Sequence, residues 1–558
     1  MSGLPETALQ AQTEIELKFL VPRAARARVL AEMARGSGSP ERKTLSASYF
    51  DTDDRRLARA GMAWRLRREG RRWVQTLKAG TSNPLERFEH EVIRPDASTD
   101  ASEHAGTPVG DRLATLLRRA RAEGIEPAVR YRTEVRRTIR RIRTRGAIVE
   151  VAFDEGRLIA AGGRLTLSEI EFELVSGSPP AMLALAERWR KRFDLIYDPR
   201  SKAERGDGLA EGERYPSVRK ARPMVYSRDA AAIEAFGIVI DECLAQITRN
   251  AVGLIDGDPD RRIEHVHQLR VGIRRLRSAL RCFRGWVPVP PEPLVQGLRA
   301  LFLLLGKSRD SDVLAGGVVA DLARAGGPAT MQSAVPSGPD PAEAVRAADT
   351  QRMLLAWIAW RTALAQVPLE SSVTPEAKST TAYGPAAGDG AAADPESSGL
   401  DLADSQSPQA QQHAATAMVP CHDPRTFHRQ LRRRLRRWHA RFASDWKSFD
   451  DLDEAGLHAL RKRIKRQRYA VECFAPVMRK RRVGRSLAVL SVIQNRMGAL
   501  NDLFVARARY QAQAASGQTA SDPAVWFALG WLAARIADLR ALAKPDLGKL
   551  AKSAPPTA

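Results

Sequence analysis

Charged and apolar residues alternate in several short segments near the start of the chain. Glu14, Glu16 and Lys18 are separated by Ile15 and Leu17, so in a β-strand the three charged side chains share one face. The same alternation recurs at Arg65 and Arg67, at Arg87, Glu89 and Glu91, at Glu150 and Asp154, and at Glu169, Glu171 and Glu173. Such faces bring carboxylates and cations together on neighbouring strands.

Alternation alone leaves two interpretations of these faces open. In an ordinary half-buried antiparallel sheet, the charged faces would point to water. Alternatively, they line a common interior, where the two signs neutralise each other and excess carboxylates bind a divalent cation. Carboxylate oxygens suit Mg²⁺ or Mn²⁺, so the second interpretation predicts a closed barrel that holds a metal on one wall and phosphates on another.

Residues 12–175 are predicted to be mainly β-strands, because turn-like glycines separate the alternating segments. The predicted strands are Ile15–Val21, Ala47–Asp51, Ala63–Arg68, Arg72–Lys78, Glu86–Ile93, Thr133–Arg143, Ala147–Phe153 and Thr166–Val175, followed by a helix over Pro179–Phe193. From Asp229 to about Leu542 the pattern is helical. We therefore expect a domain over 1–210, a linker over 211–225 and a helical domain over 226–545.

One segment interrupts the helical pattern. Residues 371–412 are rich in Ala, Ser, Gly, Pro and Gln, hold six acids and one lysine, and show no periodicity. That composition cannot bury a core. We predict a disordered insertion that separates two halves of the helical domain.

A basic helical segment occurs once in each half. His267 and His458 are each followed by cations at offsets of 3, 7 and 10, and a second motif, Gly306–Asp310 or Gly498–Asp502, follows 39 or 40 residues after the histidine. The cations are Arg270, Arg274 and Arg277 in the first copy, and Arg461, Lys465 and Arg468 in the second. These offsets fall on one helical stripe. The repeat predicts an internal duplication that presents two cationic rows to a polyanion.

Composition limits the identity of that polyanion. The 558 residues carry a net charge of +24, and residues 421–512 hold 23 Lys and Arg against 8 Asp and Glu. Nucleic acid, an anionic membrane and inorganic polyphosphate all fit such a charge. The basic helices lack interleaved exposed aromatics and carry few Asn or Gln, which disfavours sequence-specific nucleic-acid binding. No apolar stretch approaches the ~18–20 residues of a membrane span.

The N-terminal residues and the cysteines of the sequence favour a cytoplasmic protein. The first residues lack the charged and apolar regions of a secretory leader. Four scattered cysteines, Cys243, Cys282, Cys421 and Cys473, show no metal-type or redox spacing. We expect a cytoplasmic protein without membrane association, in which Cys282 and Cys473 are buried core thiols.

The N-terminal motifs resemble the CYTH family, the triphosphate tunnel metalloenzymes. The resemblance covers about residues 12–206 and rests on Thr13–Lys18, Tyr49–Thr52, Trp64–Arg67, Thr76–Lys78, Arg87–Glu91, Glu150–Asp154, Glu169–Glu171 and Ser201–Lys202. It implies an α+β domain with a tunnel of eight antiparallel strands. The family includes inorganic triphosphatases, thiamine triphosphatases, RNA triphosphatases and adenylate cyclases.

The same resemblance implies roles for individual residues. Catalysis would fall to Glu14, Glu16 and Lys18, with Lys18 either orienting water or binding the terminal phosphate. Phosphates would be bound by Arg65, Arg67, Lys78, Arg137 and Lys202, with Arg132 and Arg136 as alternatives to Arg137. Mg²⁺ or Mn²⁺ would be held by Glu14, Glu16, Asp154, Glu169 and Glu171.

The repeated basic helices resemble the CHAD domain over about residues 220–540, which implies an all-α bundle with internal duplication. CHAD domains are associated with inorganic polyphosphate, so the resemblance assigns polyphosphate binding to His267, Arg270, Arg274, Arg277, His458, Arg461, Lys465 and Arg468. The function that we expect is metal-dependent hydrolysis of inorganic tripolyphosphate, a phosphoanhydride, next to a domain that binds long-chain polyphosphate.

Two alternatives to this function remain. Other tunnel chemistry would hydrolyse thiamine triphosphate or a nucleoside triphosphate, or cyclise ATP. A degenerate tunnel would leave a non-enzymatic protein that binds polyphosphate or nucleic acid.

Overall fold

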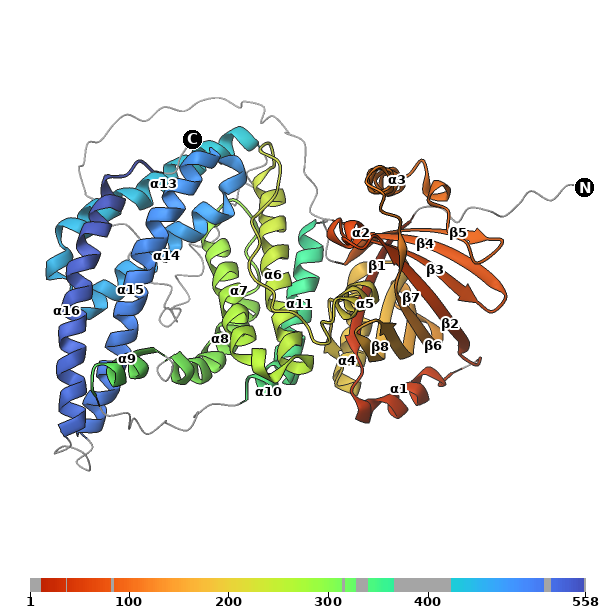
Figure 1. The fold of residues 1–558 in the computed structure, drawn as a ribbon, viewed down its shortest axis with the longest axis horizontal. Helices are drawn as coiled ribbons and strands as arrows, with labels where there is room; N and C mark the ends of the chain where they lie inside the picture. Colours follow the sequence, from red (N-terminus) through yellow and green to blue (C-terminus); the bar gives the residue numbers. More distant parts are fainter. Residues whose placement is uncertain are drawn as a thin grey trace, which may run out of the picture.

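The computed structural model describes residues 12–36, 38–81, 85–313, 317–327, 340–365, 423–515 and 523–555. A strand-rich part and a helical part lie next to each other (Figure 1). None of the helices in these ranges combines the length and the apolar character needed to cross a membrane. The predicted insertion at 371–412, Cys421 and the side chains of Lys307 to Asp310 fall outside the described residues.

The strand-rich part is built on one antiparallel sheet. Its strands are β1 (Gln12–Leu20), β2 (Glu41–Asp51), β3 (Met62–Glu69), β4 (Arg72–Gly80), β5 (Glu86–Arg94), β6 (Ala128–Thr144), β7 (Ala147–Ala160), β8 (Gly163–Gly177) and the short β9 (Ile196–Tyr197). Their order is β5-β4-β3-β2-β6-β7-β8-β1-β9, and β1 also pairs with β5. That extra pairing closes eight strands into a barrel and confirms the predicted eight-stranded tunnel.

Alternation along each strand decides which side chains point inward. On β1, Leu17 and Phe19 belong to a buried apolar cluster together with Trp189 of α4 (Pro179–Phe193). Lys18 lies between them and therefore points to the opposite side of the sheet, into the barrel. All eight predicted strands form, and most extend beyond the predicted bounds, because hairpin pairing continues past the alternating segments.

Short helices cover the outside of the barrel and connect its strands. They are the 3₁₀ helix η1 (Arg23–Ala25), α1 (Arg26–Met33), α2 (Arg56–Arg59), η2 (Ala101–His104), α3 (Pro108–Ala122), α4 and α5 (Lys202–Ala210). Residues 211–231 follow α5 without helix or strand. We refer to residues 211–225 as the linker.

The remaining elements are helical. They are α6 (Ala232–Asp256), η3 (Pro259–Arg261), α7 (Arg262–Cys282), α8 (Glu292–Val313), α9 (Val319–Arg324), α10 (Pro341–Arg346), α11 (Ala348–Ala365), α13 (Pro424–Lys447), η5 (Phe449–Asp451), α14 (Glu454–Cys473), η6 (Ala475–Val477), α15 (Lys480–Ala515) and α16 (Pro523–Lys552). The two repeated basic segments are α7 and α14. Their predicted apolar faces are buried, including Leu269 and Ile273 on α7 and Leu460 and Ile464 on α14.

The two repeats meet at the ends of these basic helices. Phe283, directly after α7, lies against Phe474, directly after α14, with ring centroids 4.8 Å apart. Cys282 and Cys473 are buried beside this contact, as the sequence predicted. The duplication is therefore visible as two copies of a helix pair, α7–α8 and α14–α15, joined through an aromatic core.

The helical domain also completes the core of the barrel domain. Leu355 and Ile358 of α11 belong to the apolar cluster on the outer face of the barrel, and α11 packs against α4. The backbone N–H of Tyr197 donates to Oε1 of Gln351 at 3.0 Å. The contact surface between the domains is thus apolar at its centre, and the two domains share buried side chains.

Replacing both interface residues should destabilise the whole protein. We expect Leu355→Ala with Ile358→Ala to cost about 2–5 kcal/mol per residue, because each truncation leaves a cavity in a packed core. The measurement is urea unfolding followed by circular dichroism and by tryptophan fluorescence. Leu303→Ala is the control, since Leu303 is 57% exposed on α8. An equal effect of the control and the double variant would contradict a shared core.

Candidate active site in the barrel interior

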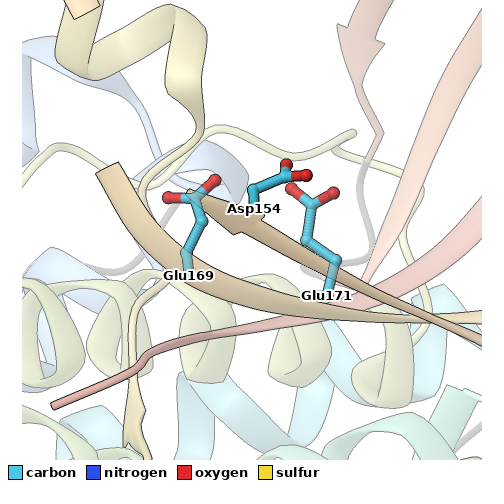
Figure 2. A group of neighbouring side chains, drawn as sticks. All are labelled: Asp154, Glu169 and Glu171. Atoms are coloured by element: carbon cyan, nitrogen blue, oxygen red, sulfur yellow. The ribbon is translucent and has the colours of Figure 1, made fainter. Parts of the chain in front are cut away.

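Three carboxylates point toward one another inside the barrel (Figure 2). They are Asp154 of β7 and Glu169 and Glu171 of β8, and one oxygen of each lies within 4.8 Å of the other two. Strand register produces the group: Asp154 is directly opposite Glu169, and Glu171 follows two residues later on the same face. Asp154 and Glu169 have no exposed surface, so their charges require partners inside the protein.

The ammonium group of Lys202 is a partner of all three. Its Nζ lies 2.7 Å from Asp154, 2.6 Å from Glu169 and 2.8 Å from Glu171. Lys202 is the first residue of α5, and the hydroxyl of Ser201 caps this helix by accepting a backbone hydrogen bond from its first turn. The cap fixes the point from which Lys202 reaches the carboxylates.

Arg137 lies beside the same carboxylates. It is opposite Asp154 in the β6–β7 register, and it donates Nε and Nη2 to Asp154 at 2.8 and 2.7 Å, and Nη2 to Glu171 at 2.5 Å. Arg132 and Arg136 are exposed on the outer side of β6. Of the three arginines considered from the sequence, Arg137 is therefore the one that the fold places inside the barrel.

Arg205 was not among the residues predicted from the sequence. It lies one turn after Lys202 on α5 and donates Nη1 to Oε2 of Glu169 at 2.7 Å. The sequence carries one signal that identifies it. A cation three residues after Lys202 falls on the same face of a helix, so both side chains can reach the same group of carboxylates.

Electrostatics keep this group charged. Burial opposes ionisation of Glu171, but Lys202 and Arg137 outweigh burial and hold the pKa of Glu171 well below its ordinary value. The pKa of Asp154 is lowered in the same way, because Arg137 and Lys202 outweigh its burial. Burial also opposes the charge on Lys202, yet the carboxylates raise the pKa of Lys202 well above its ordinary value. Asp154, Glu171 and Lys202 are all ionised at neutral pH.

A second charged group lies on β1, β3, β4 and β5. Nζ of Lys78 is 3.1 Å from Oε2 of Glu14. Nη2 of Arg65 and Nη2 of Arg67 are 3.4 and 3.2 Å from the same oxygen of Glu91. The three cations predicted to bind phosphate on these strands are thus gathered by shared carboxylates, as an interior lined by both signs requires.

Glu16 and Lys18 extend this charged interior along β1. Burial opposes ionisation of Glu16, but Arg87, which lies 2.7 Å away, together with Lys78 and Lys18 lowers the pKa of Glu16. Lys18 is 3% exposed, and burial lowers the pKa of Lys18 even though Glu169 opposes that shift. Arg87 is a second functional candidate that the predicted site omitted, although its strand face was recognised.

The carboxylate group fits a divalent cation. Lys202 already shows that a cation can contact one oxygen of each of the three carboxylates at once. These oxygens are the hard ligands that Mg²⁺ and Mn²⁺ bind. Glu14 and Glu16 lie outside this group of three and have their own partners, Lys78 and Arg87. Their role as metal ligands stays a prediction.

The predicted cationic row of α7 is partly enclosed. Arg270 is 8% exposed, donates Nη1 to the carbonyl of Phe302 at 2.8 Å, and lies over the Phe302 ring at 4.2 Å. His267, Arg274 and Arg277 are half-buried. Arg270 therefore also holds α7 against α8, which periodicity alone did not indicate.

The row of α14 is more open at its start. His458 is exposed and its Nδ1 lies 3.1 Å from Oδ1 of Asn501 on α15. Arg461 and Lys465 are half-buried, and Arg468 forms an ion pair with Glu472 at 2.9 Å. The predicted second motif, Gly498–Asp502, thus lies beside the histidine of its own repeat.

Comparisons with known proteins agree with both halves of this description. The CYTH domain model matches residues 12–206 and the CHAD domain model matches residues 238–511. An inorganic triphosphatase of Haemophilus influenzae is 30% identical over 164 residues, which are 29% of this chain and 45% of that relative. The chain therefore spans less than half the length of this relative.

Solved structures with similar chains include a plant protein for each domain. The CHAD domain of Ricinus communis is 28% identical, with a TM-score of 0.41, over 60% of this chain and 96% of that chain. A putative adenylyl cyclase from Hippeastrum, described as having a dominant triphosphatase activity, is 19% identical, with a TM-score of 0.27, over 36% of this chain and 96% of that one.

Removing the shared cation tests the carboxylate group. We expect Lys202→Gln to lower stability at neutral pH by about 3–5 kcal/mol, because three buried carboxylates lose a common partner. Mn²⁺ should stabilise this variant more than the wild type, since a metal can take the place of the ammonium. Thermal unfolding with and without Mn²⁺ measures both effects.

The control for this variant is Lys191→Gln, which removes an exposed lysine from α4. It should unfold like the wild type with or without metal. The metal assignment is wrong if Lys202→Gln gains no more from Mn²⁺ than Lys191→Gln does.

Proposed function

We propose that this chain, a CYTH domain followed by a CHAD domain, hydrolyses inorganic tripolyphosphate in its barrel with Mg²⁺ or Mn²⁺ and binds long-chain polyphosphate on its helical domain. One observation carries the first part: a buried group of carboxylates and cations in which every charge has a partner of opposite sign. Such a group is costly to bury and stabilises a fold poorly. Perturbed, buried charges of this kind concentrate at functional sites.

The distribution of cations supports a linear polyanion as the substrate. Arg65 and Arg67 come from β3, Lys78 from β4, Arg137 from β6 and Lys202 from α5. Cations that come from several separate elements can each bind a different phosphate of one linear chain. A single small anion could contact only a few of them. The inward-facing residues described above are charged and suit phosphate groups. These features favour tripolyphosphate over thiamine and nucleoside triphosphates.

Exchange of partners explains how a site that is already neutral accepts a substrate. Asp154, Glu169 and Glu171 would hold the metal, and Lys202 and Arg137 would then be released from their carboxylate partners. Phosphate oxygens would take the place of these carboxylates, and Arg137 would donate paired N–H groups to them in bidentate geometry. When bound, the metal supplies charge stabilisation for the leaving group. The cations hold the chain in line and neutralise its terminal phosphates.

We infer that Lys18 acts on the substrate or on water. It lies opposite Glu171 in the β1–β8 register, and its lowered pKa reflects an enclosed position. Lys18 would bind the terminal phosphate or orient the attacking water. The register with Glu171 and the enclosed position of the ammonium support both roles.

The helical domain supplies a second surface for the same class of anion. The half-buried Arg274 and Lys465 lie on the repeated basic helices α7 and α14. A flexible polyphosphate chain can follow such rows, whereas rigid duplex DNA needs a broad complementary face. Binding there would raise the concentration of substrate near the barrel.

Glu16→Gln should abolish phosphate release from tripolyphosphate, because it removes a charge paired with Arg87 without altering the packed outer face of β1. The assay is release of phosphate from tripolyphosphate, thiamine triphosphate, ATP and long-chain polyphosphate, with and without Mg²⁺ or Mn²⁺. Glu134→Gln is the matched control, since Glu134 forms a half-exposed ion pair with Arg157. Wild-type kcat in Glu16→Gln, or faster hydrolysis of ATP than of tripolyphosphate, would overturn the proposal.

Arg274→Gln with Lys465→Gln should weaken binding of long-chain polyphosphate and flatten its salt dependence, because fewer counterions are released. Fluorescence anisotropy at several salt concentrations measures both. Arg188→Gln with Lys191→Gln removes the same charges from the exposed face of α4 and should have no such effect. Duplex DNA binding as tight as polyphosphate binding at ~150 mM salt would favour a nucleic-acid-binding protein instead.

A further inference from the structure

A cavity of about 600 Å³ lies where the two domains meet. It is lined by residues of β8, α5, the linker and α6 and is called the seam cavity below. Seven Lys and Arg residues line it, against three acids. Its volume is within the range of small-molecule sites, and its excess of cations indicates an anionic ligand.

Ion pairs across the domains bound the seam cavity. Nη2 of Arg249 on α6 lies 2.8 Å from Glu204 of α5, and Nη2 of Arg200 lies 2.9 Å from Asp256 of α6. These pairs use two of the three acids that line the cavity. The domains are therefore held together at the same place where surplus positive charge collects.

The surplus comes from the linker. Arg214, Lys220 and Arg222 line the seam cavity, and within the described ranges no carboxylate forms an ion pair with their side chains. The pairs already described occupy Arg200 and Arg249. Cations that converge without carboxylates repel one another, so the folded linker gains stability when an anion enters.

Arg205 joins this cavity to the barrel. It lines the seam cavity and also donates to Glu169 of the carboxylate group. An anion at the seam and the metal site in the barrel would therefore share one guanidinium group. The two places are otherwise distinct, because the linker cations have no contact with the barrel carboxylates.

We propose that the seam cavity binds an oligophosphate anion through Arg214, Lys220 and Arg222 of the linker together with Arg205. Arginine matches phosphate oxygens with paired N–H donors, and the cavity is large enough for more than one phosphate unit. The ligand can be tripolyphosphate or a segment of a longer chain. This binding requires neither metal nor hydrolysis, so it holds or fails independently of the proposed function.

Hydrogen–deuterium exchange of the linker tests the proposal on the full chain. With EDTA present and ~150 mM salt, tripolyphosphate should slow exchange at residues 213–222 in a saturable way, and orthophosphate should require higher concentrations. The same experiment is repeated with long-chain polyphosphate. The half-saturating concentrations of the two ligands, expressed as total phosphate, show whether the cavity prefers tripolyphosphate or a segment of a long chain.

Lys220→Gln with Arg222→Gln should raise the half-saturating concentration of tripolyphosphate about tenfold, which corresponds to about 1.4 kcal/mol. The control, Arg188→Gln with Lys191→Gln, removes the same charges from α4 and should behave as wild type. Linker exchange that does not respond to tripolyphosphate would overturn the proposal. Equal protection of the linker in both double variants would also overturn the proposal, because the protection would then arise from binding outside the seam cavity. Protection by sulfate as strong as that by tripolyphosphate would show that the cavity does not select phosphate chains.

Discussion

Closure of the barrel by β1 determines how the charged residues of the N-terminal half are paired. Residues 12–15 of β1 pair with β5, and residues 16–20 pair with β8, so the charged face of each strand has no route to bulk water except along the barrel. Charges enclosed in this way must neutralise one another or take up counterions. The paired groups around Lys202 and Lys78 follow from that requirement, and so does the capacity of the interior for a metal and a polyanion.

Alternation in the sequence predicted which residues share a face, and all eight strands formed as predicted. It did not decide whether those faces meet an interior or solvent, because that depends on closure between β1 and β5, a pairing between distant segments. Register determined finer details. Arg137 reaches Asp154 because the two are cross-strand partners, while Arg132 and Arg136, close in sequence, point outward. Arg205 was missed because its contact depends on where α5 starts.

The helical half shows the same limit in a different form. Periodicity identified the buried faces of α7 and α14 and the cationic stripes opposite them. It did not show how far a neighbouring helix covers a stripe. Arg270 belongs to the stripe of α7, yet α8 encloses it, because the Phe302 carbonyl and ring together satisfy a buried guanidinium group. A cation on a helical stripe can thus be part of helix packing, ligand binding or both.

Helix α5 links the barrel site to the domain seam through three residues of its first turn, Lys202, Glu204 and Arg205. Lys202 and Arg205 contact the carboxylate group, and Glu204, on another face of the same turn, pairs with Arg249 of the helical domain. A displacement of α5 would therefore change both sets of ion pairs at once. Because α11 contributes Leu355 and Ile358 to the barrel's apolar cluster, the helical domain restrains the elements that carry these contacts. The geometry of the carboxylate group depends on the domain interface as well as on the barrel.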